Sequence, residues 1–345
     1  MKIAVYTIAK NEEQFVKRWA NSCRDADFRL ILDTGSTDGT MVEALNCGVN
    51  VSKEVFNPWR FDVARNKALS LIPDDIDICI ALDMDEVLQE GWRECLEAMP
   101  KETTRPRYKY VWSWNDDGSE GLVYGGDKIH TRHGYIWKHP VHEVLYPLSQ
   151  EIQNWCGLRI HHYPDKTKSR GQYFPLLELA VEEDPNNDRN RYYLGREYFF
   201  HGMNNKAVEQ FNRYLELANW APERAAACRY LYKITKDEKY LWMAVSEDRN
   251  RRETWVLLSQ HFYECADWES CKYFASRALR ITTKPMDYLC ESDSWSWLPY
   301  DFLAIASYRL GEFEAAFENG KLALSCKQDD QRLISNLKFY EDSLK

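Results

Sequence analysis

Residues 76–86, with the sequence IDICIALDMDE, decide the fold class of this chain. The residues from Ile78 to Leu82 are all apolar, and Asp83 and Asp85 come directly after them. An unbroken apolar run of this length is typical of a strand that is buried on both faces, as in a parallel sheet covered by helices. Polar groups that follow such a strand lie at the edge where α/β sheets bind ligands. The stretch therefore predicts an α/β sheet with an acidic pair at its ligand-binding edge.

Strand and helix patterns alternate through the residues that precede this stretch. Short apolar runs predict strands over residues 3–8, 28–32 and 49–55. Helical spacing predicts helices over residues 12–23, 37–45 and 62–71, with Ser36 or Thr37 as the N-cap of the second helix. Alternation of this kind favours a parallel sheet. From residue 108 to residue 161 the pattern changes to short aromatic strands separated by glycine turns.

Beyond residue 165 the strand patterns stop and only helices are predicted. Their ranges are 173–183, 189–201, 206–218, 223–235, 253–266, 268–282, 299–310, 312–326 and 328–344. Helices joined by short turns are typical of an α-solenoid, and apolar and small residues fit the 34-residue tetratricopeptide pattern in places. We therefore expect two domains, an α/β domain over residues 1–165 and an all-helical domain over residues 166–345.

Composition and charge argue against several classes of protein. The chain has 45 basic and 54 acidic residues, a net charge of −9, which disfavours a broad nucleic-acid-binding surface. It has no apolar run of the roughly 18 residues that a membrane span needs, and its apolar start is too short for a signal peptide. The ten cysteines are scattered and form no C-x-x-C pair, so we expect small buried side chains in a reducing cytoplasm.

The acidic pair has three interpretations from the residues alone. Carboxylates at a strand end supply the hard oxygen ligands that a divalent cation on a diphosphate requires. They also occur as a solvated acidic turn. A third alternative is the nucleophile loop of haloacid-dehalogenase-like phosphatases, in which the first aspartate is phosphorylated. That loop normally follows the first strand of its domain and carries glycine where this chain has Glu86, and both differences weigh against it.

Four segments together carry a resemblance to a known family. They are TIAKNE at 7–12, LDTGSTDGT at 32–40, FNPWRFDVARN at 56–66 and LDMDE at 82–86. In this order they resemble family 2 glycosyltransferases of the GT-A fold, and most of all those with an appended tetratricopeptide-like helical tail. The resemblance covers about residues 1–165 by motif and the remainder by architecture alone. It implies a GT-A nucleotide-diphospho-sugar transferase domain followed by an all-α array.

The resemblance also implies roles for residues of the nucleotide pocket. Thr7, Asn11 and Glu12 match the segment after the first strand that lines this pocket. Asp33 matches the acid at the end of the second strand that contacts the base, and Arg65 matches an arginine near the base or the diphosphate. Where many relatives have a second acid after the position of Asp33, this chain has Thr34.

The metal and the chemistry are implied in the same way. Asp83 is expected near the ribose and the sugar, and Asp85 on Mn²⁺ or Mg²⁺. A histidine beyond the acidic pair often completes such a site, and His162 is favoured over His142 because it matches the histidine of a strand-end His-Tyr segment in the family. Glu143 is the candidate base that takes the proton of the acceptor hydroxyl, and a salt bridge to a nearby arginine or lysine is its alternative role. A transfer that retains configuration would need no such base.

The resemblance implies a cytoplasmic hexosyl- or pentosyltransferase whose expected donor is a UDP-sugar. Its acceptor hydroxyl could belong to a glycan or lipid-linked saccharide, a peptide side chain, or a modified base in phage DNA. The helical domain would present the acceptor or form a homodimer. The alternative is a tetratricopeptide-like interaction protein with an inactive transferase domain.

Two clusters of residues have both a structural and a ligand-binding interpretation. Four tryptophans of the first domain either plug a sheet or stack on a sugar or base; they are Trp112, Trp114, Trp137 and Trp155. The run DRNRR at 248–252 either starts a helix in solvent or binds phosphate. The structural interpretation is favoured for both clusters.

Overall fold

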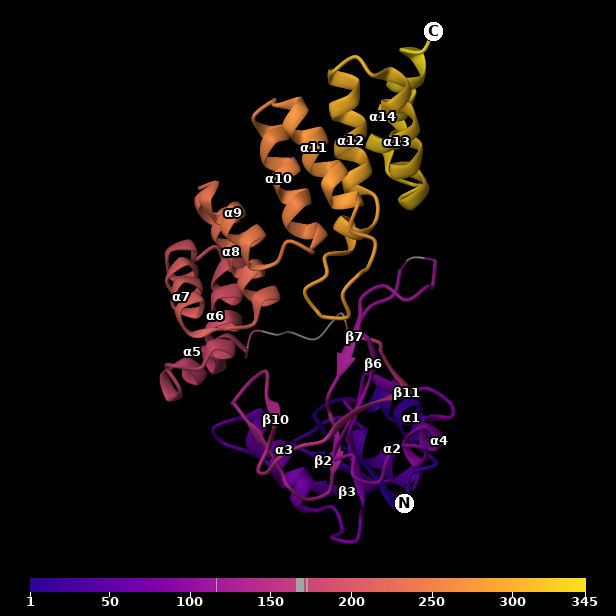
Figure 1. Ribbon diagram of the computed structural model, residues 1–345. Helices are drawn as coiled ribbons and strands as arrows, with labels where there is room; N and C mark the ends of the chain where they lie inside the picture. The colour runs from indigo at the N-terminus through magenta and orange to yellow at the C-terminus, as the bar shows by residue number, and fades with distance from the viewer. Residues whose placement is uncertain (116, 166–170, 172) are drawn as a thin grey trace. The chain divides into compact units, whose positions relative to one another are not determined.

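The computed structural model describes residues 1–115, 117–165, 171 and 173–345 (Figure 1). Contacts between residues divide the chain into two compact units, Met1–Glu183 and Asp184–Lys345. The first unit mixes helices and sheets, and the second is helical. The boundary predicted after residue 165 borders residues 166–170, which lie outside the described part of the chain, and it stays a prediction.

The central sheet of the first unit has five strands in the order β3-β2-β1-β4-β8. These are β1 (Ile3–Ala9), β2 (Phe28–Asp33), β3 (Asn50–Lys53), β4 (Ile78–Ala81) and β8 (Ile129–Thr131). The first four are parallel and β8 is antiparallel to β4. The strands that the apolar runs predict are therefore all present.

Helices cover both faces of this sheet, which explains its unbroken apolar runs. On one face Ile3, Val5, Ile31 and Ile80 pack with Val16 and Trp19 of α1 (Glu13–Ser22). On the other face Ala4, Tyr6, Leu32 and Ala81 pack with Ala68 and Leu69 of α3 (Phe61–Ser70). Alternate residues of each strand point to opposite faces, so both sets must be apolar.

The helix α2 (Thr40–Asn46) begins three residues later than predicted. Its N-cap is Gly39, so the N-cap prediction of Ser36 or Thr37 is wrong. The reason is a loop held by side chains from two other segments: Ser36 donates its N–H to Asp33, and Thr37 donates its N–H to Asn11. The short helix α4 (Trp92–Glu97) was not predicted.

A second sheet has four strands in the order β5-β11-β6-β7, and a hairpin of β9 and β10 lies apart from it. These strands are β5 (Glu86–Leu88), β6 (Arg105–Val111), β7 (Val123–Gly126), β9 (Tyr135–Lys138), β10 (Val144–Pro147) and β11 (Gln153–His162). Antiparallel pairing of β11 with β5 sets His162 opposite Glu86. The end of a late strand is thus brought beside the acidic pair.

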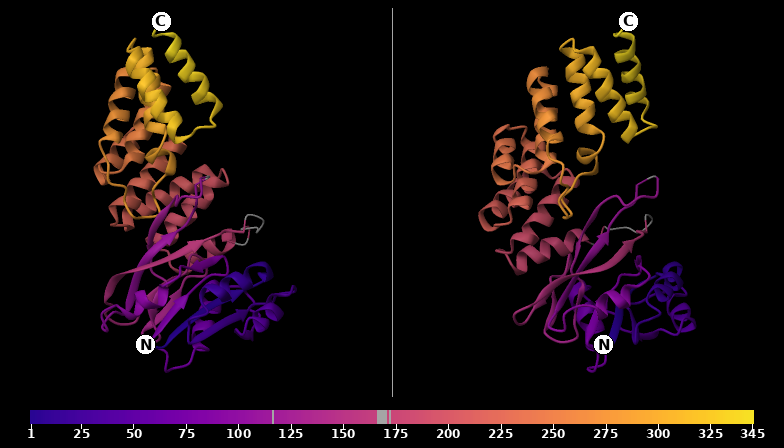
Figure 2. Two further views of the ribbon diagram at one scale, coloured as in Figure 1. Left: turned by 90° about the vertical axis from the view of Figure 1, so that its right-hand side faces the viewer. Right: turned by 45° about the vertical axis from the view of Figure 1, so that its right-hand side comes forward.

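Helices of the second unit pack against their neighbours in chain order, side by side (Figures 1 and 2). They are α6 (Asp188–Phe200), α7 (Asn204–Leu217), α8 (Ala221–Thr235), α9 (Lys239–Glu247), α10 (Arg252–Glu264), α11 (Trp268–Leu279), η1 (Ser292–Trp295), α12 (Leu298–Arg309), α13 (Phe313–Cys326) and α14 (Gln331–Asp342). Only α9 and η1 were not predicted. The helix α5 (Tyr173–Glu183) has the predicted bounds and belongs by its contacts to the first unit.

Three further expectations meet the structure here. The ten cysteines are free thiols, but Cys265 and Cys326 are exposed, so the expectation of burial is wrong for these two. In the basic run, Arg249 and Asn250 are exposed as predicted for a solvated helix start, but Arg251 is buried and pairs with Asp248 and Asp287, so the prediction is wrong for Arg251. Within the described ranges, none of the helices has the length and apolar character needed to cross a bilayer.

Candidate active site at the edge of the central sheet

The acidic pair lies at the point where the order of the central sheet reverses. The chain builds β1, β2 and β3 in one direction and then places β4 on the other side of β1. In open α/β sheets this switch point, at the carboxyl ends of the strands, is where ligands bind. Leu82 donates its N–H to the carbonyl of Tyr6 at 3.0 Å, so Thr7 and Asp83 lie at the ends of adjacent strands.

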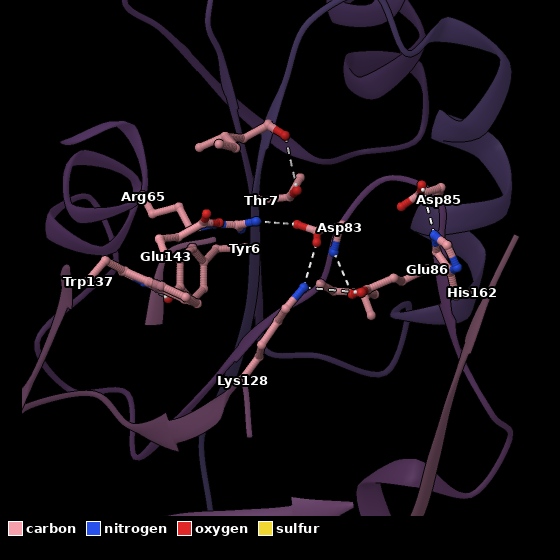
Figure 3. Close-up of polar contacts among 12 residues, drawn as sticks. Tyr6, Thr7, Arg65, Asp83, Asp85, Glu86, Lys128, Trp137, Glu143 and His162 are labelled. Carbon is pink, nitrogen blue, oxygen red and sulfur yellow. Dashed lines mark hydrogen bonds and ion pairs between the residues drawn. The ribbon is translucent and has the colours of Figure 1, made fainter. Parts of the chain in front are cut away.

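Asp83 is held between two cations (Figure 3). Its Oδ1 accepts a hydrogen bond from Arg65 Nη2 at 2.7 Å, and its Oδ2 accepts one from Lys128 Nζ at 2.6 Å. Burial raises the pKa of Asp83, yet the two positive charges outweigh burial and hold that pKa well below its ordinary value. Asp83 is therefore ionised, with both carboxylate oxygens engaged by side chains of this chain.

Glu86 is almost fully buried, and its side chain holds the backbone of the turn that carries Asp83 and Asp85. Its Oε2 accepts the backbone N–H of Asp83 at 2.8 Å, and its Oε1 accepts from Tyr110 and from Lys128. Burial, with the nearby charges of Asp83 and Asp85 adding to it, raises the pKa of Glu86. These bonds fix the turn between β4 and β5.

Asp85 points away from this cluster and toward His162, as Figure 3 shows. The distance between Asp85 Oδ2 and His162 Nε2 is 3.3 Å. His162 Nδ1 lies 3.0 Å from the carbonyl oxygen of Trp112, which can only accept, so Nδ1 carries a proton. Burial lowers the pKa of His162, but the bonds to Asp85 and Trp112 outweigh burial and raise it. Nε2 is thus the ring nitrogen that faces Asp85.

Arg65 links the acidic pair to Glu143. Its Nε donates to Glu143 Oε1, its Nη2 donates to Asp83, and its guanidinium lies 5.0 Å from the centre of the Trp137 ring. The side chain is 6% exposed. Its Nη1 is buried and has no hydrogen-bond partner among the described residues. That nitrogen is a charged donor at the switch point.

The other residues predicted for the nucleotide pocket hold loops in the structure. Asp33 is buried, and its Oδ1 accepts the N–H groups of Gly35 and Ser36 at 3.0 Å. Asn11 has a left-handed backbone with φ of 56° and accepts the N–H of Thr37 at 2.8 Å. These contacts shape the loops after β1 and β2.

Two more of these residues lie on or just after β1. Glu12 donates its backbone N–H to Thr40 Oγ1 at 2.8 Å, which ties the start of α1 to the start of α2. Thr7 is fully buried, and its hydroxyl donates to the carbonyl of Ile8 at 3.2 Å. Thr7 thus lies at the switch point itself, while Glu12 lies at the rim of the neighbouring loop.

His142 is brought to a different place from His162. It has a left-handed backbone with φ of 50°, and its ring lies 6.1 Å from the ring of Tyr173. His161, next to His162, faces the other side of β11 and contacts Trp114. Of the two candidate histidines, His162 is the one that the structure sets beside Asp85.

The four tryptophans do not form one platform. Trp137 is buried and donates its Nε1–H to Tyr6. Trp112 stacks on His162 with ring centres 4.3 Å apart, and Trp114 stacks on Tyr163. Trp155 is 56% exposed. Trp112 therefore supports the histidine beside the acidic pair, and Trp137 fills a core.

Lys128 is the residue of this site that sequence reasoning missed. It lies between β7 and β8, and its backbone carbonyl accepts the N–H of Ala81 at 3.1 Å. Burial lowers the pKa of Lys128, but Asp83 and Glu86 outweigh burial and raise it well above its ordinary value. A single lysine two residues after a Gly-Gly pair matches no motif, so only the pairing of β8 with β4 could reveal its role.

No family model matches this chain, and no curated protein matches it. Solved structures resemble parts of it. The structure of MamA has 17% identity and a TM-score of 0.38, over 49% of this chain and 99% of its own. The Cut9–Hcn1 hetero-tetramer of the APC/C has 13% identity and a TM-score of 0.41, over 50% of this chain and 34% of its own.

A third structure is glucosyl-3-phosphoglycerate synthase from Mycobacterium tuberculosis in complex with Mn²⁺, UDP and glucosyl-3-phosphoglycerate. It has 23% identity and a TM-score of 0.27, over 32% of this chain. This chain spans 44% of the length of that synthase. Likenesses this partial decide neither fold nor function.

Proposed function

We propose that the first unit is a metal-dependent glycosyltransferase of the GT-A fold. It would transfer a sugar from a nucleotide-diphospho-sugar, with a UDP-sugar as the expected donor, to an acceptor hydroxyl. The observation that carries the proposal is the pairing of Asp85 with His162 beside the buried charges of Arg65 and Lys128, at the switch point of a parallel sheet. This combination supplies ligands for a cation and donors for a phosphate in one place.

Asp85 and His162 fit a divalent cation. Their facing atoms are 3.3 Å apart, and adjacent ligands of an octahedral Mg²⁺-sized ion lie about 3 Å apart. No group of three or more acidic, histidine or cysteine side chains with ligand geometry occurs among the residues that the structure describes. Two protein ligands suffice where substrate phosphates and water complete the shell. When bound, Mn²⁺ or Mg²⁺ would offset the charge of a departing diphosphate.

Arg65 would act on the donor directly, and Lys128 would act through Asp83. The Nη1 group of Arg65 is buried without a partner and would donate to a phosphate oxygen, a bond strengthened by charge on both groups. Lys128 holds Asp83 ionised and in place. In this proposal Asp83 meets the ribose and sugar, while Thr7, Asn11, Glu12 and Asp33 shape the pocket of the nucleotide.

Glu143 would take the proton of the acceptor hydroxyl. Its Oε1 is fixed by Arg65 Nε, and its Oε2 has no donor among the described residues. Proton transfer to a positioned carboxylate speeds such a reaction by about 10²–10⁴-fold. Glu143→Gln should therefore slow transfer by about that factor and leave donor binding within a few-fold of the wild type. The exposed Glu97→Gln is the matched control, and unchanged turnover in Glu143→Gln would remove the base role.

Titration of the full chain with UDP, with and without Mn²⁺, tests the donor site. Asp85→Asn should abolish the part of the affinity that depends on Mn²⁺ while leaving the thermal midpoint nearly unchanged, because Asp85 is part-exposed and the amide of the variant can still hydrogen-bond His162 Nε2. Asp25→Asn, at an exposed position, is the control. Wild-type metal dependence in Asp85→Asn would place the metal elsewhere.

One observation favours the alternative of an interaction protein with an inactive transferase domain. Both oxygens of Asp83 are occupied by Arg65 and Lys128, as in a purely structural cluster. Under this alternative the wild type binds no nucleotide sugar at all, with or without Mn²⁺. The same titration therefore separates the two.

A further inference from the structure

The second unit contains a cavity of about 160 Å³ that the proposed transferase chemistry does not use. Helix α6 contributes Tyr192 and Arg196 to its wall, and α8 contributes Arg229, Tyr230 and Lys233. Glu291, in the segment before η1, lies at its edge. The cavity is smaller than the roughly 300–1,000 Å³ of pockets for drug-sized ligands, so it suits a small chemical group.

Helical spacing explains why these residues share one wall. Tyr192 and Arg196 are four residues apart on α6, and Arg229 and Lys233 are four apart on α8. Residues at this spacing lie on one face of a helix. Ala226, one turn before Arg229 and Tyr230, also lines the cavity, and its small side chain leaves the space open. Helix α6 thus presents one cationic and one aromatic side chain to the cavity, and α8 presents two cationic side chains and one aromatic one.

Arg229 is buried without full compensation. Its side chain is 3% exposed, and neither Nε nor Nη1 has a hydrogen-bond partner among the described residues. The nearest carboxylate oxygen, Oε1 of Glu291, is 3.5 Å from Nε. Nε of Arg196 also lacks a hydrogen-bond partner. Buried charged donors without acceptors are unfavourable, and an anion in the cavity would supply the acceptors.

The charge of the cavity wall is positive although the chain is acidic. Arg196, Arg229 and Lys233 face Glu291, the one acid among the described residues that line the cavity, and the other oxygen of Glu291 is 3.8 Å from Lys233 Nζ. Glu223 lies nearby but accepts a hydrogen bond from Tyr288 and does not line the cavity. Three cations against one acid leave two positive charges, which match a dianion better than a carboxylate.

We propose that this cavity binds the phosphate group of a phosphomonoester. Such a group carries between one and a half and two negative charges near neutral pH and three acceptor oxygens, roughly the charge and the donors that Arg196, Arg229 and Lys233 leave unmatched. Guanidinium groups recognise phosphate with paired N–H donors. Tyr192 and Tyr230 flank the cations and would contact the carbon atoms next to the phosphate.

Calorimetric titration of the full chain with inorganic phosphate at constant ionic strength tests this site. Arg229→Met should raise the Kd about tenfold, because it removes hydrogen bonds to a charged group. Lys233→Met, at a part-exposed position that tolerates substitution, should raise it about threefold. Glu291→Gln should lower the Kd about threefold, because it removes the one competing acid.

Arg213→Met is the matched control, since Arg213 is exposed on α7 and outside the cavity. Wild-type affinity in both Arg229→Met and Lys233→Met would overturn the proposal, as would acetate binding as tightly as phosphate. Glucose 6-phosphate and a phosphoserine peptide are titrated in parallel, and tighter binding of either than of phosphate supports the site and identifies its source. All variants lie in the second unit, so their effects are independent of the transferase proposal.

Discussion

Arg65 and Arg229 are buried to nearly the same degree, with 6% and 3% of the side chain exposed, but their surroundings differ. Arg65 donates to two carboxylates, Asp83 and Glu143. Arg229 has one carboxylate oxygen at 3.5 Å, and its Nε and Nη1 make no hydrogen bond to any described residue. Burial alone therefore does not tell what an arginine does. Two carboxylates compensate most of the charge of Arg65 and leave one donor, Nη1, without a partner among the described residues, whereas two such donors on Arg229 mark a place where an anion can bind.

Replacing each arginine by methionine should give the largest difference between the two sites in the free energy of unfolding. Arg65→Met leaves Glu143 without its cation and Asp83 with Lys128 alone, and it should lower the free energy of unfolding by about 3–5 kcal/mol. Arg229→Met removes a charge that lacks hydrogen bonds and keeps the aliphatic volume, so its effect should stay within about 1 kcal/mol. Urea denaturation of the full chain measures both, and amide hydrogen exchange in β1 and β4 assigns the loss to the first unit. Equal losses for the two variants would show that the comparison is wrong.

At low pH the first unit gains a positive charge at His130, which is linked through Tyr6 to Trp137, the tryptophan that Arg65 contacts. Trp137 Nε1 donates to Tyr6, whose hydroxyl contacts His130 Nε2 at 3.1 Å, while His130 Nδ1 faces the carbonyl of Thr131. A carbonyl can only accept, so Nδ1 carries the proton and Nε2 accepts from Tyr6. Burial lowers the pKa of His130 to about 4. This network is therefore neutral over the physiological pH range.

The pKa of His130 is lower in the folded chain than in the unfolded chain, where it is about 6.5. As the pH falls below about 6.5 the unfolded chain takes up the proton first, so stability is lost between about pH 6.5 and about pH 4. The loss should total about 3 kcal/mol. His130→Gln should lack this component, so the difference in unfolding free energy between wild type and variant shrinks across that window. A difference that is constant with pH would contradict the buried neutral histidine.

Two glycines, Gly126 in the first unit and Gly195 in the second, compare how tightly side chains pack in the two units. A Cβ on Gly126 of β7 would lie 2.2 Å from the ring of buried Tyr108, and a Cβ on Gly195 of α6 would lie 3.0 Å from the ring of Phe211. Gly126→Ala should cost about 2 kcal/mol through overpacking. Gly195→Ala should stay near zero, because the gain of about 1 kcal/mol from helix propensity offsets the tight contact. Thermal unfolding of the two variants checks the order, and a larger loss at Gly195 would reverse it.

The sequence predicted the elements of the fold because each element is encoded by a local period. The apolar run before Asp83 is a buried strand, and α5 has the predicted bounds. The short helix α9 was missed because nine residues give too few turns for a helical period to stand out. The start of α2 was misplaced because the side chains of Asn11 and Asp33, from other segments, hold the loop before it.

The candidate site was predictable only in part, for the same physical reason. The position of Asp83 and Asp85 after a buried strand follows from residues that are neighbours in the chain. Lys128 and Trp112 lie near the acidic pair because strands that are far apart in the sequence pair with one another, and no local sequence pattern predicts this position. The ion pair of Glu143 with Arg65 likewise joins residues 78 positions apart.

The sequence by itself thus determined an α/β unit with an acidic pair at its edge and a helical unit after it. Tertiary structure alone decided which charges are compensated: two cations lie at Asp83, one histidine lies at Asp85, and no described residue accepts a hydrogen bond from Nε or Nη1 of Arg229. The reason is that periodicity depends on residues a few positions apart, whereas the electrostatic partner of a buried charge is set by which distant segments pack against it.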